Sequence, residues 1–135
     1  MQFELKLPLL GFESIKTMTL TKIDDTFMQL EASDDENKTS FTLINPFILK
    51  KYEIDIPESI QKTLEITEDS NILIFNIIVI HTPIEDSTIN FVAPLLFNVD
   101  NKTMVQTILD GKAAQEHGMA EPISSFMNKE EDQNA

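Results

Sequence analysis

The chain has 135 residues, with ten lysines and arginines against 23 aspartates and glutamates and a formal net charge of -13. Its 41% hydrophobic content suffices for the core of one ordinary domain and argues against a disordered chain. The acidic balance argues against direct binding to nucleic acid or to anionic membranes. Cysteine is absent, which excludes disulfides and thiolate metal sites.

The beginning of the chain lacks the basic and apolar stretches of a signal peptide. The longest apolar run, Ile72–Ile80, is interrupted by Asn76 and covers about half of the roughly 20 residues that a membrane helix needs. We therefore expect a cytoplasmic protein in which this run is a buried strand.

Alternating apolar and polar residues predict a series of short β-strands. In the first, Phe3, Leu5 and Leu7 share one face until Pro8 ends the strand. Further strands are expected at Ile15–Leu20, Phe27–Ala32, Thr39–Asn45, Asn71–His81, Thr88–Val99 and Thr103–Leu109. About seven strands fit this length. The pattern predicts an all-β, mainly antiparallel fold, a small closed or partly open β-barrel.

Acidic turn residues at Asp34–Asn37 and at Glu85–Asp86 predict loops between strands. One helix interrupts the strand pattern, because Pro57 suits a first helical turn and Ile60 and Leu64 lie one turn apart on a common face. We expect this helix to plug one end of the barrel.

The strand pattern stops after Leu109, which divides the chain into a barrel domain at 1–109 and a partly helical C-terminal tail at 110–135. A short helix is expected between Asp110 and Gly118. A second, starting near Pro122, would place Ile123, Phe126 and Met127 on one apolar patch. Such a patch is expected to dock on the barrel or on a partner.

Motifs of catalysis are missing from the sequence. There is no Gly-x-Ser-x-Gly elbow, and three glycines cannot form a phosphate-binding loop. His81 and His117 lack the spacing of a zinc site, and the carboxylates cluster in loop-like pairs where solvation is the usual reason. We predict no enzyme, no cofactor and no metal, and by elimination a surface that recognises a partner.

Three segments, in this order and spacing, resemble the FliW family of flagellar assembly factors. They are Leu9–Glu13, Phe41–Phe47 with Tyr52 just after, and Thr88–Leu95 continuing to Gln106–Leu109. The likeness covers residues 1 to 109. One departure is visible, since Gly11 is followed by Phe12, Glu13 and Ser14 where the family has a stretch resembling Gly-x-Pro-Gly.

The resemblance implies a monomeric, non-enzymatic cytoplasmic protein that binds newly made flagellin and the translational repressor CsrA, each excluding the other. Free flagellin would occupy the protein and release CsrA to silence flagellin mRNA, and flagellin export would reverse this. An acidic surface suits this role because it steers a basic RNA-binding protein, although acidity also simply favours solubility.

Residues where strands give way to loops are the candidates for partner binding. They are Asn45, Pro46, Phe47, Tyr52, Asn90, Ala93 and Pro94, together with Ile123, Phe126 and Met127 of the tail. The structural alternative is that Pro46 only ends a strand, that Phe47 fills the core, and that Pro94 marks an edge or bulge.

Two other functions remain open at this stage. One is a dedicated cytoplasmic flagellin chaperone without CsrA as a partner. The other is a small barrel enzyme or flavin-binding barrel, which would need convergent polar groups in one pocket.

Overall fold

The computed structural model describes residues 1–9, 11–33, 39–49, 52, 54–109, 118 and 120–125. In this part of the chain, nine strands form one sheet. They are β1 (Gln2–Leu5), β2 (Thr17–Lys22), β3 (Phe27–Ala32), β4 (Ser40–Ile44), β5 (Ile72–Val79), β6 (Thr88–Ile89), β7 (Leu95–Asn98), β8 (Thr103–Gln106) and β9 (Glu121–Pro122). The helical elements are α1 (Glu58–Thr63) and the short 3-10 helices η1 (Pro46–Ile48) and η2 (Ile84–Asp86).

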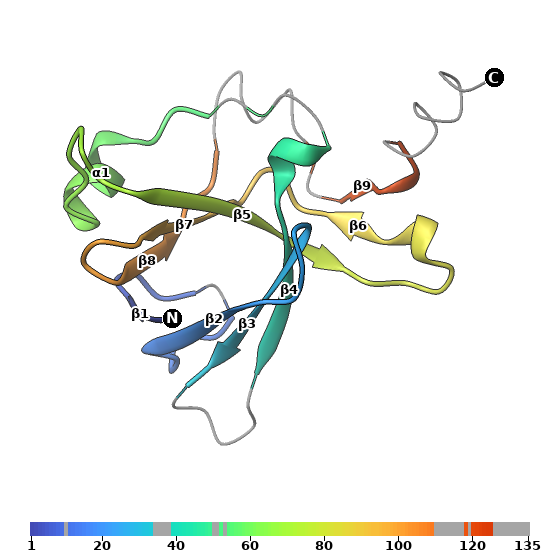
Figure 1. The fold of residues 1–135 in the computed structure, drawn as a ribbon, viewed down its shortest axis with the longest axis horizontal. Coiled ribbons are helices and arrows are strands. Elements are labelled where there is room, and N and C mark those ends of the chain that lie inside the picture. The colour runs from blue at the N-terminus through green and yellow to red at the C-terminus, as the bar shows by residue number, and fades with distance from the viewer. Residues whose placement is uncertain are drawn as a thin grey trace.

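Seven of these strands close into a barrel. Neighbours follow the order β4-β3-β2-β1-β8-β7-β5, and β5 pairs again with β4 to complete the ring. The β1–β8 pair is parallel and the other described pairs are antiparallel. Figure 1 shows this ring, with β6 and β9 extending beyond it from β5. The predicted mainly antiparallel barrel is therefore confirmed.

The register of the strands separates an inner face from an outer one. Leu43 pairs with Met28 on one side and Ile77 on the other, and these side chains belong to the inner cluster. The next position along β4, Ile44, faces outward because side chains alternate along a strand. It pairs with Asn76 of β5.

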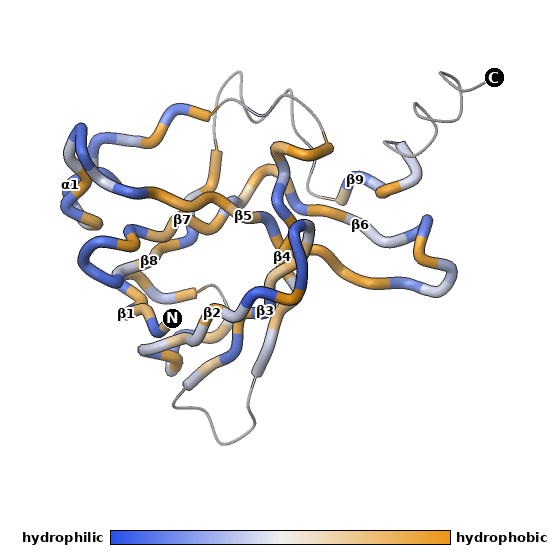
Figure 2. Tube along the Cα trace, viewed as in Figure 1, coloured by the Kyte–Doolittle hydropathy of each residue, from blue (hydrophilic) through white to orange (hydrophobic). Residues whose placement is uncertain are grey.

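Large apolar side chains fill the barrel. Its inner cluster consists of Phe3, Leu5, Leu9, Ile15, Met18, Leu20, Leu30, Ala32, Leu43, Leu95, Phe97 and Met104. The rings of Phe3 and Phe97 meet edge to face with centroids 5.0 Å apart. Figure 2 shows that β5 is hydrophobic along most of its length, as expected for a strand covered on both faces.

Helix α1 does not plug the barrel, so that prediction is wrong. Leu96 and Val105 alternate with inward residues of β7 and β8, and Ile60 and Leu64 cover them from outside. The interior is already filled, whereas this outer apolar face needed a cover. Figure 1 places α1 at the side of the ring, beyond β7 and β8.

The predicted strand Thr88–Val99 is wrong in its middle, because β6 ends at Ile89 and β7 begins at Leu95. The Asn90 Oδ1 atom accepts hydrogen bonds from the N–H groups of Val92 (3.1 Å) and Ala93 (3.2 Å), which turns the chain. Such Asn turns compete with strand pairing, and Pro94 cannot donate to a ladder.

Two further details concern the turn at Gly11, near the beginning of the chain, and the strand at Glu121–Pro122, near its end. Gly11 has a φ of +87°, in the left-handed region that glycine adopts without steric cost, and it forms the turn before Phe12. Glu121–Pro122 is a strand, and the chain becomes helical at Ser124 and Ser125, so the predicted helix near Pro122 begins two residues later and leaves Ile123 outside it. The expected Asp34–Asn37 loop, the helix between Asp110 and Gly118, and Phe126 and Met127 fall outside the described residues.

The outer packing of α1 predicts the effect of a core truncation. Leu64→Ala should lower the free energy of unfolding by about 2–4 kcal/mol, because Leu64 is fully buried against Leu96 and Val105. Urea denaturation measures this. Ile48→Ala, at a side chain 52% exposed, is the matched control and should cost about 1 kcal/mol or less. Equal effects would contradict the described packing.

Candidate functional site

A buried polar junction lies on the outer face of the barrel, where Asn76 of β5 is completely buried. Its Nδ2 donates to the Asn90 carbonyl oxygen (2.8 Å) and to the Tyr52 hydroxyl oxygen (3.3 Å). The Tyr52 hydroxyl donates to the Phe91 carbonyl oxygen (2.5 Å). The junction thus joins β5 to two segments, around Tyr52 and Asn90–Phe91, that lie far apart in the sequence.

An apolar shell surrounds this junction. We call it the outer cluster, and its buried members are Ile44, Tyr52, Ile78, Ile89, Phe91 and Leu109. Phe27, Leu49, Ile54, Ile74 and Ile123 pack against it while remaining partly exposed. In such surroundings an unpaired polar atom is costly, yet Asn76 Oδ1 has no hydrogen-bond partner among the described residues. Asn76 therefore holds the segments around Tyr52 and Asn90 in place through its Nδ2 group, while its unpaired Oδ1 lowers the stability of the fold.

The surroundings shift the ionisation of Tyr52. Burial raises the pKa of its hydroxyl above the ordinary value of 10.0. The hydrogen bond with Asn76 acts in the opposite direction, and the negative charge of Glu121 raises the pKa further. Tyr52 therefore stays neutral and serves as a structural hydrogen-bonding group at physiological pH.

An exposed apolar rim sits at the edge of the outer cluster. Asn45 accepts a hydrogen bond from the Phe47 N–H (3.0 Å) through its side chain and so begins η1, with Pro46 buried beneath. This turn leaves Phe47 53% exposed and Ile48 52% exposed. The Phe47 ring still meets Tyr52 edge to face, with centroids 6.0 Å apart. We call Phe47 and Ile48 the η1 rim.

The structure brings most of the sequence-predicted site residues together. Asn45 caps the turn that carries the η1 rim, Pro46 is buried in that turn, and Phe47 belongs to the rim. Tyr52 and Asn90 both bond to Asn76. Ala93 and Pro94 are buried in the loop that Asn90 turns, so they position backbone and do not present side chains. The expectation that Phe47 fills the core is wrong.

Two important residues were missed as site residues. Asn76 was visible in the sequence as the single polar residue inside the apolar run Ile72–Ile80, which signals a buried polar role. Ile48 carried no signal, because its exposure depends on the 3-10 turn that Asn45 caps.

The tail reaches the same region. Ile123 packs on the outer cluster, and its N–H donates to the Ser87 carbonyl oxygen (2.8 Å). The Phe91 N–H donates to the Gly118 carbonyl oxygen (3.0 Å). Gly118 and Ile123 thus both contact the segment from Ser87 to Phe91, which carries part of the junction.

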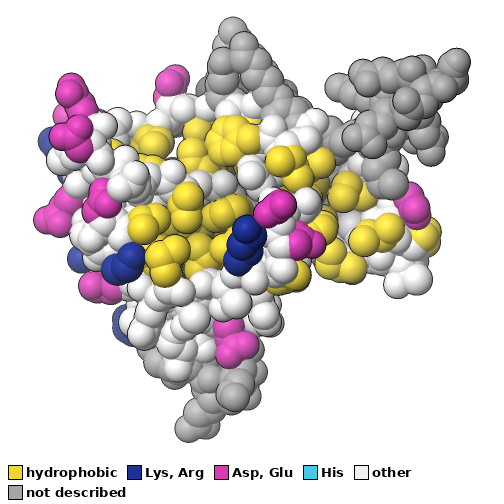
Figure 3. Space-filling model, viewed as in Figure 1, with side chains coloured by type: hydrophobic (Ala, Val, Ile, Leu, Met, Phe, Trp, Pro, Cys, Tyr) yellow, Lys and Arg dark blue, Asp and Glu magenta, His cyan; other side chains and the backbone are white. Residues whose placement is uncertain are grey.

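A second apolar surface lies at one end of the barrel. Side chains packed against the inner cluster remain partly exposed there, namely Met28, Phe41, Leu73, Phe75, Ile77 and Val99. Figure 3 shows hydrophobic side chains gathered over the middle of the ring and over η1, with acidic and basic side chains both beside this patch and toward the periphery. The molecule presents apolar surface on this face, the usual mark of protein recognition.

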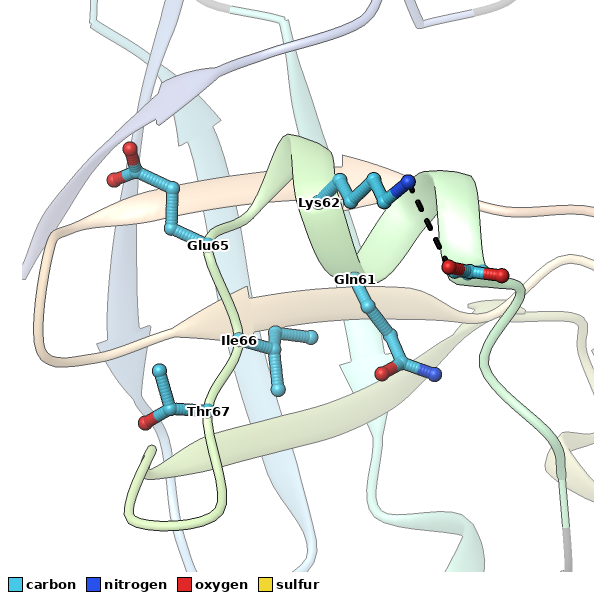
Figure 4. A pocket seen from close by; sticks show the side chains of 6 residues that line it. Gln61, Lys62, Glu65, Ile66 and Thr67 are labelled. Atoms are coloured by element: carbon cyan, nitrogen blue, oxygen red, sulfur yellow. Dashed lines mark ion pairs between the residues drawn. The ribbon is translucent and has the colours of Figure 1, made fainter.

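A polar hollow on the surface is a weaker candidate for a functional site than these apolar surfaces. One of about 340 Å³ lies beside α1, between Gln61 and Lys62 of the helix and the chain from Glu65 to Thr67 that follows it (Figure 4). Its charged groups include the exposed pair Glu58–Lys62, whose N–O distance is 3.6 Å.

The described residues contain no group of three His, Cys, Asp or Glu side chains that could hold a metal ion. No described helix has the length and apolar character needed to cross a membrane.

Comparison with known proteins gives consistent matches. A family model described as FliW protein matches residues 1–123. The chain is 50% identical over 129 residues to a flagellar assembly factor FliW of Sulfurimonas denitrificans, which covers 96% of this chain and 100% of that protein. It is 48% identical over 130 residues to flagellar assembly factor FliW 2 of Wolinella succinogenes, covering 96% and 95%.

A solved structure agrees in fold. The crystal structure of the flagellar assembly factor FliW superposes with a TM-score of 0.81 at 24% identity, over 90% of this chain and 84% of that one. At this identity the likeness concerns the fold.

Tyr52 is the single tyrosine of a chain without tryptophan, so its ionisation can be followed directly by tyrosinate absorbance. We predict a midpoint above pH 10.0 in the folded protein and an ordinary midpoint near 10 in denaturant. The raised pKa means that the folded state keeps a proton which the unfolded state loses. The stability that protonated Tyr52 contributes to the fold is fully present below pH 10, and it is lost as the pH rises through the pKa of Tyr52 in the folded state. A folded midpoint at or below 10 would show that Tyr52 is not buried as described.

Proposed function

The chain belongs to the FliW family, and on that premise we propose that it is a cytoplasmic flagellar assembly factor that binds flagellin and the translational repressor CsrA in a mutually exclusive way. It would act through binding alone. Flagellin would hold the protein while unexported, and after export the free protein would capture CsrA and restore flagellin translation by mass action.

The observation that carries the proposal is the η1 rim. Phe47 and Ile48 are each about half exposed, on a turn fixed by the Asn45 cap and supported by the ring of Tyr52. Aromatic and apolar side chains on a rigid base anchor protein interfaces because little conformational entropy is lost on binding. An amphipathic helix, such as those of the exported flagellin ends, offers a matching apolar face.

The predicted site residues divide into two roles in this proposal. Phe47 contacts the partner, while Asn45, Pro46, Tyr52, Asn90, Ala93 and Pro94 hold the surface in shape. The tail residues Ile123, Phe126 and Met127 are proposed to add an apolar contact beside it, as part of a tail separate from the barrel domain.

Charge supports CsrA as the second partner. The net charge of -13 repels RNA and attracts a basic RNA-binding protein, which speeds encounter without contact to the RNA itself. The two partners compete if their sites overlap or are coupled. A standard interface takes about 800 Å² from each partner, roughly a tenth of the total accessible surface of 8221 Å², so competition requires the two sites to overlap or to be coupled and does not follow from area alone.

The switch is tested by competition. A preformed complex with CsrA is titrated with a peptide of the flagellin C-terminal helix, and the order is then reversed. Each partner should release the other, and linkage requires the two losses of affinity to be equal. Phe47→Ser should weaken binding of the flagellin peptide about tenfold or more. Ile84→Ser, at a side chain 50% exposed on η2, is the matched control for the peptide.

A ternary complex with both affinities unchanged would contradict the switch. Binding of flagellin with no detectable binding of CsrA would indicate a dedicated flagellin chaperone instead.

A further inference from the structure

The outermost strand of the sheet is formed by the protein's own tail. β9 pairs with β6 through Thr88 with Pro122 and Ile89 with Glu121. The Ile123 N–H extends the pairing to the Ser87 carbonyl oxygen. Figure 1 shows β9 beside β6, outside the barrel ring. Residues 121–123 therefore occupy a sheet edge that would otherwise offer unpaired backbone groups.

The attachment of this strand is small. β9 contains two residues, and Pro122 lies opposite Thr88 at a position that makes no hydrogen bond to β6. Ile123 is the residue of this strand segment that packs on the outer cluster, and it remains partly exposed. A two-residue strand at the end of the sheet can leave the edge without unfolding the barrel, because local openings follow local contact density.

Gly118 is bonded to the first residue of β9. The Gly118 N–H donates to the Glu121 carboxylate (2.8 Å), and a Cβ added at Gly118 would lie 2.8 Å from Glu121 Cγ. Because Gly118 has no Cβ, the Glu121 side chain can come this close to its backbone. Gly118 is also bonded to the segment after β6, because its carbonyl oxygen accepts from the Phe91 N–H, and full displacement of the tail from the edge would break this bond.

The surroundings of the edge extend well beyond β9. Val79, Ile80 and Ile84 are 52%, 50% and 50% exposed on the β5–β6 hairpin, beside the exposed carboxylates of Glu85 and Asp86. This surface combines apolar side chains with negative charge, next to backbone groups suited to strand pairing. An extended segment with apolar and basic residues complements all three features.

We propose that the β6 edge is a strand-addition site, which residues 121–123 occupy in the free protein and which an extended, basic and apolar partner segment takes in their place. The inference rests on the proposed function. Of the two partners proposed there, CsrA is the basic one, and we take CsrA to be the occupant of the β6 edge. Displacement of β9 then precedes or accompanies CsrA binding, and the tail sets the apparent affinity through the fraction of open molecules.

Opening can be measured without any partner. The amides of Phe91 and Ile123, bonded to Gly118 and Ser87, should exchange hydrogen through local opening, faster than a barrel amide such as that of Ala32, which donates to Thr39. If Phe91 and Ile123 exchange only as fast as Ala32, β9 is a fixed cover of the edge and the proposal is wrong.

A disulfide lock tests the consequence for binding. Since Ser87 and Ile123 are a hydrogen-bonded pair, the adjacent pair Thr88 and Pro122 is a non-hydrogen-bonded one, whose Cα atoms lie close enough for a disulfide. The chain has no cysteine of its own, so the double variant Thr88→Cys, Pro122→Cys closes this bond alone. Oxidation should slow exchange at Phe91 and weaken CsrA binding about tenfold or more.

The control is the same double variant in its reduced form, so that both arms carry the same two substitutions and differ only in the disulfide, and the reduced form should bind CsrA about tenfold or more tightly than the oxidised form. Equal binding by the oxidised and reduced forms would overturn the strand-addition site while leaving the proposed function intact. Failure of the unaltered protein to bind CsrA at all would refute the proposed function, and this inference with it, even where local opening is observed.

Discussion

The hydrogen bonds of one buried side chain, Asn76, determine how the outer half of this protein is arranged. The barrel interior needs no such device because it is filled by apolar side chains. On the outer face of β5, however, an amide sits among isoleucines and must find partners, since a buried polar group without them is strongly destabilising. The Tyr52 hydroxyl and the Asn90 carbonyl supply them for the Nδ2 group of Asn76. Two loops are thereby held at fixed positions.

Several consequences follow from that constraint. With Tyr52 fixed, η1 is supported from below and its apolar side chains stay in solvent. With Asn90 fixed, β6 stops and the chain turns, which creates the short edge where the tail docks. A surface of this kind has the rigidity that partner recognition requires, and none of it depends on catalytic chemistry.

The sequence predicted the barrel because alternation along a strand is a local signal that the sheet obeys. It placed α1 wrongly because periodicity identifies an apolar face and not the surface that the face covers. It merged β6 and β7 because the break depends on the side chain of Asn90, which bonds to the backbone of Val92 and Ala93. Position at strand ends was the signal that singled out Asn45, Pro46, Phe47 and Asn90, which the structure places at or beside the outer cluster. The buried role of Asn76 and the exposure of Ile48 depend on tertiary contacts that no local pattern encodes.

The central claim is that Tyr52 and Asn76 act together in fixing the outer half of the molecule, and a double-mutant cycle tests it most directly. The free energy of unfolding is measured for the unaltered protein, Tyr52→Phe, Asn76→Ala and the double variant. We expect a coupling energy of about 1 kcal/mol, because either single change removes the same hydrogen bond. Additive effects, with no coupling, would show that the two side chains stabilise the protein independently and would contradict the account.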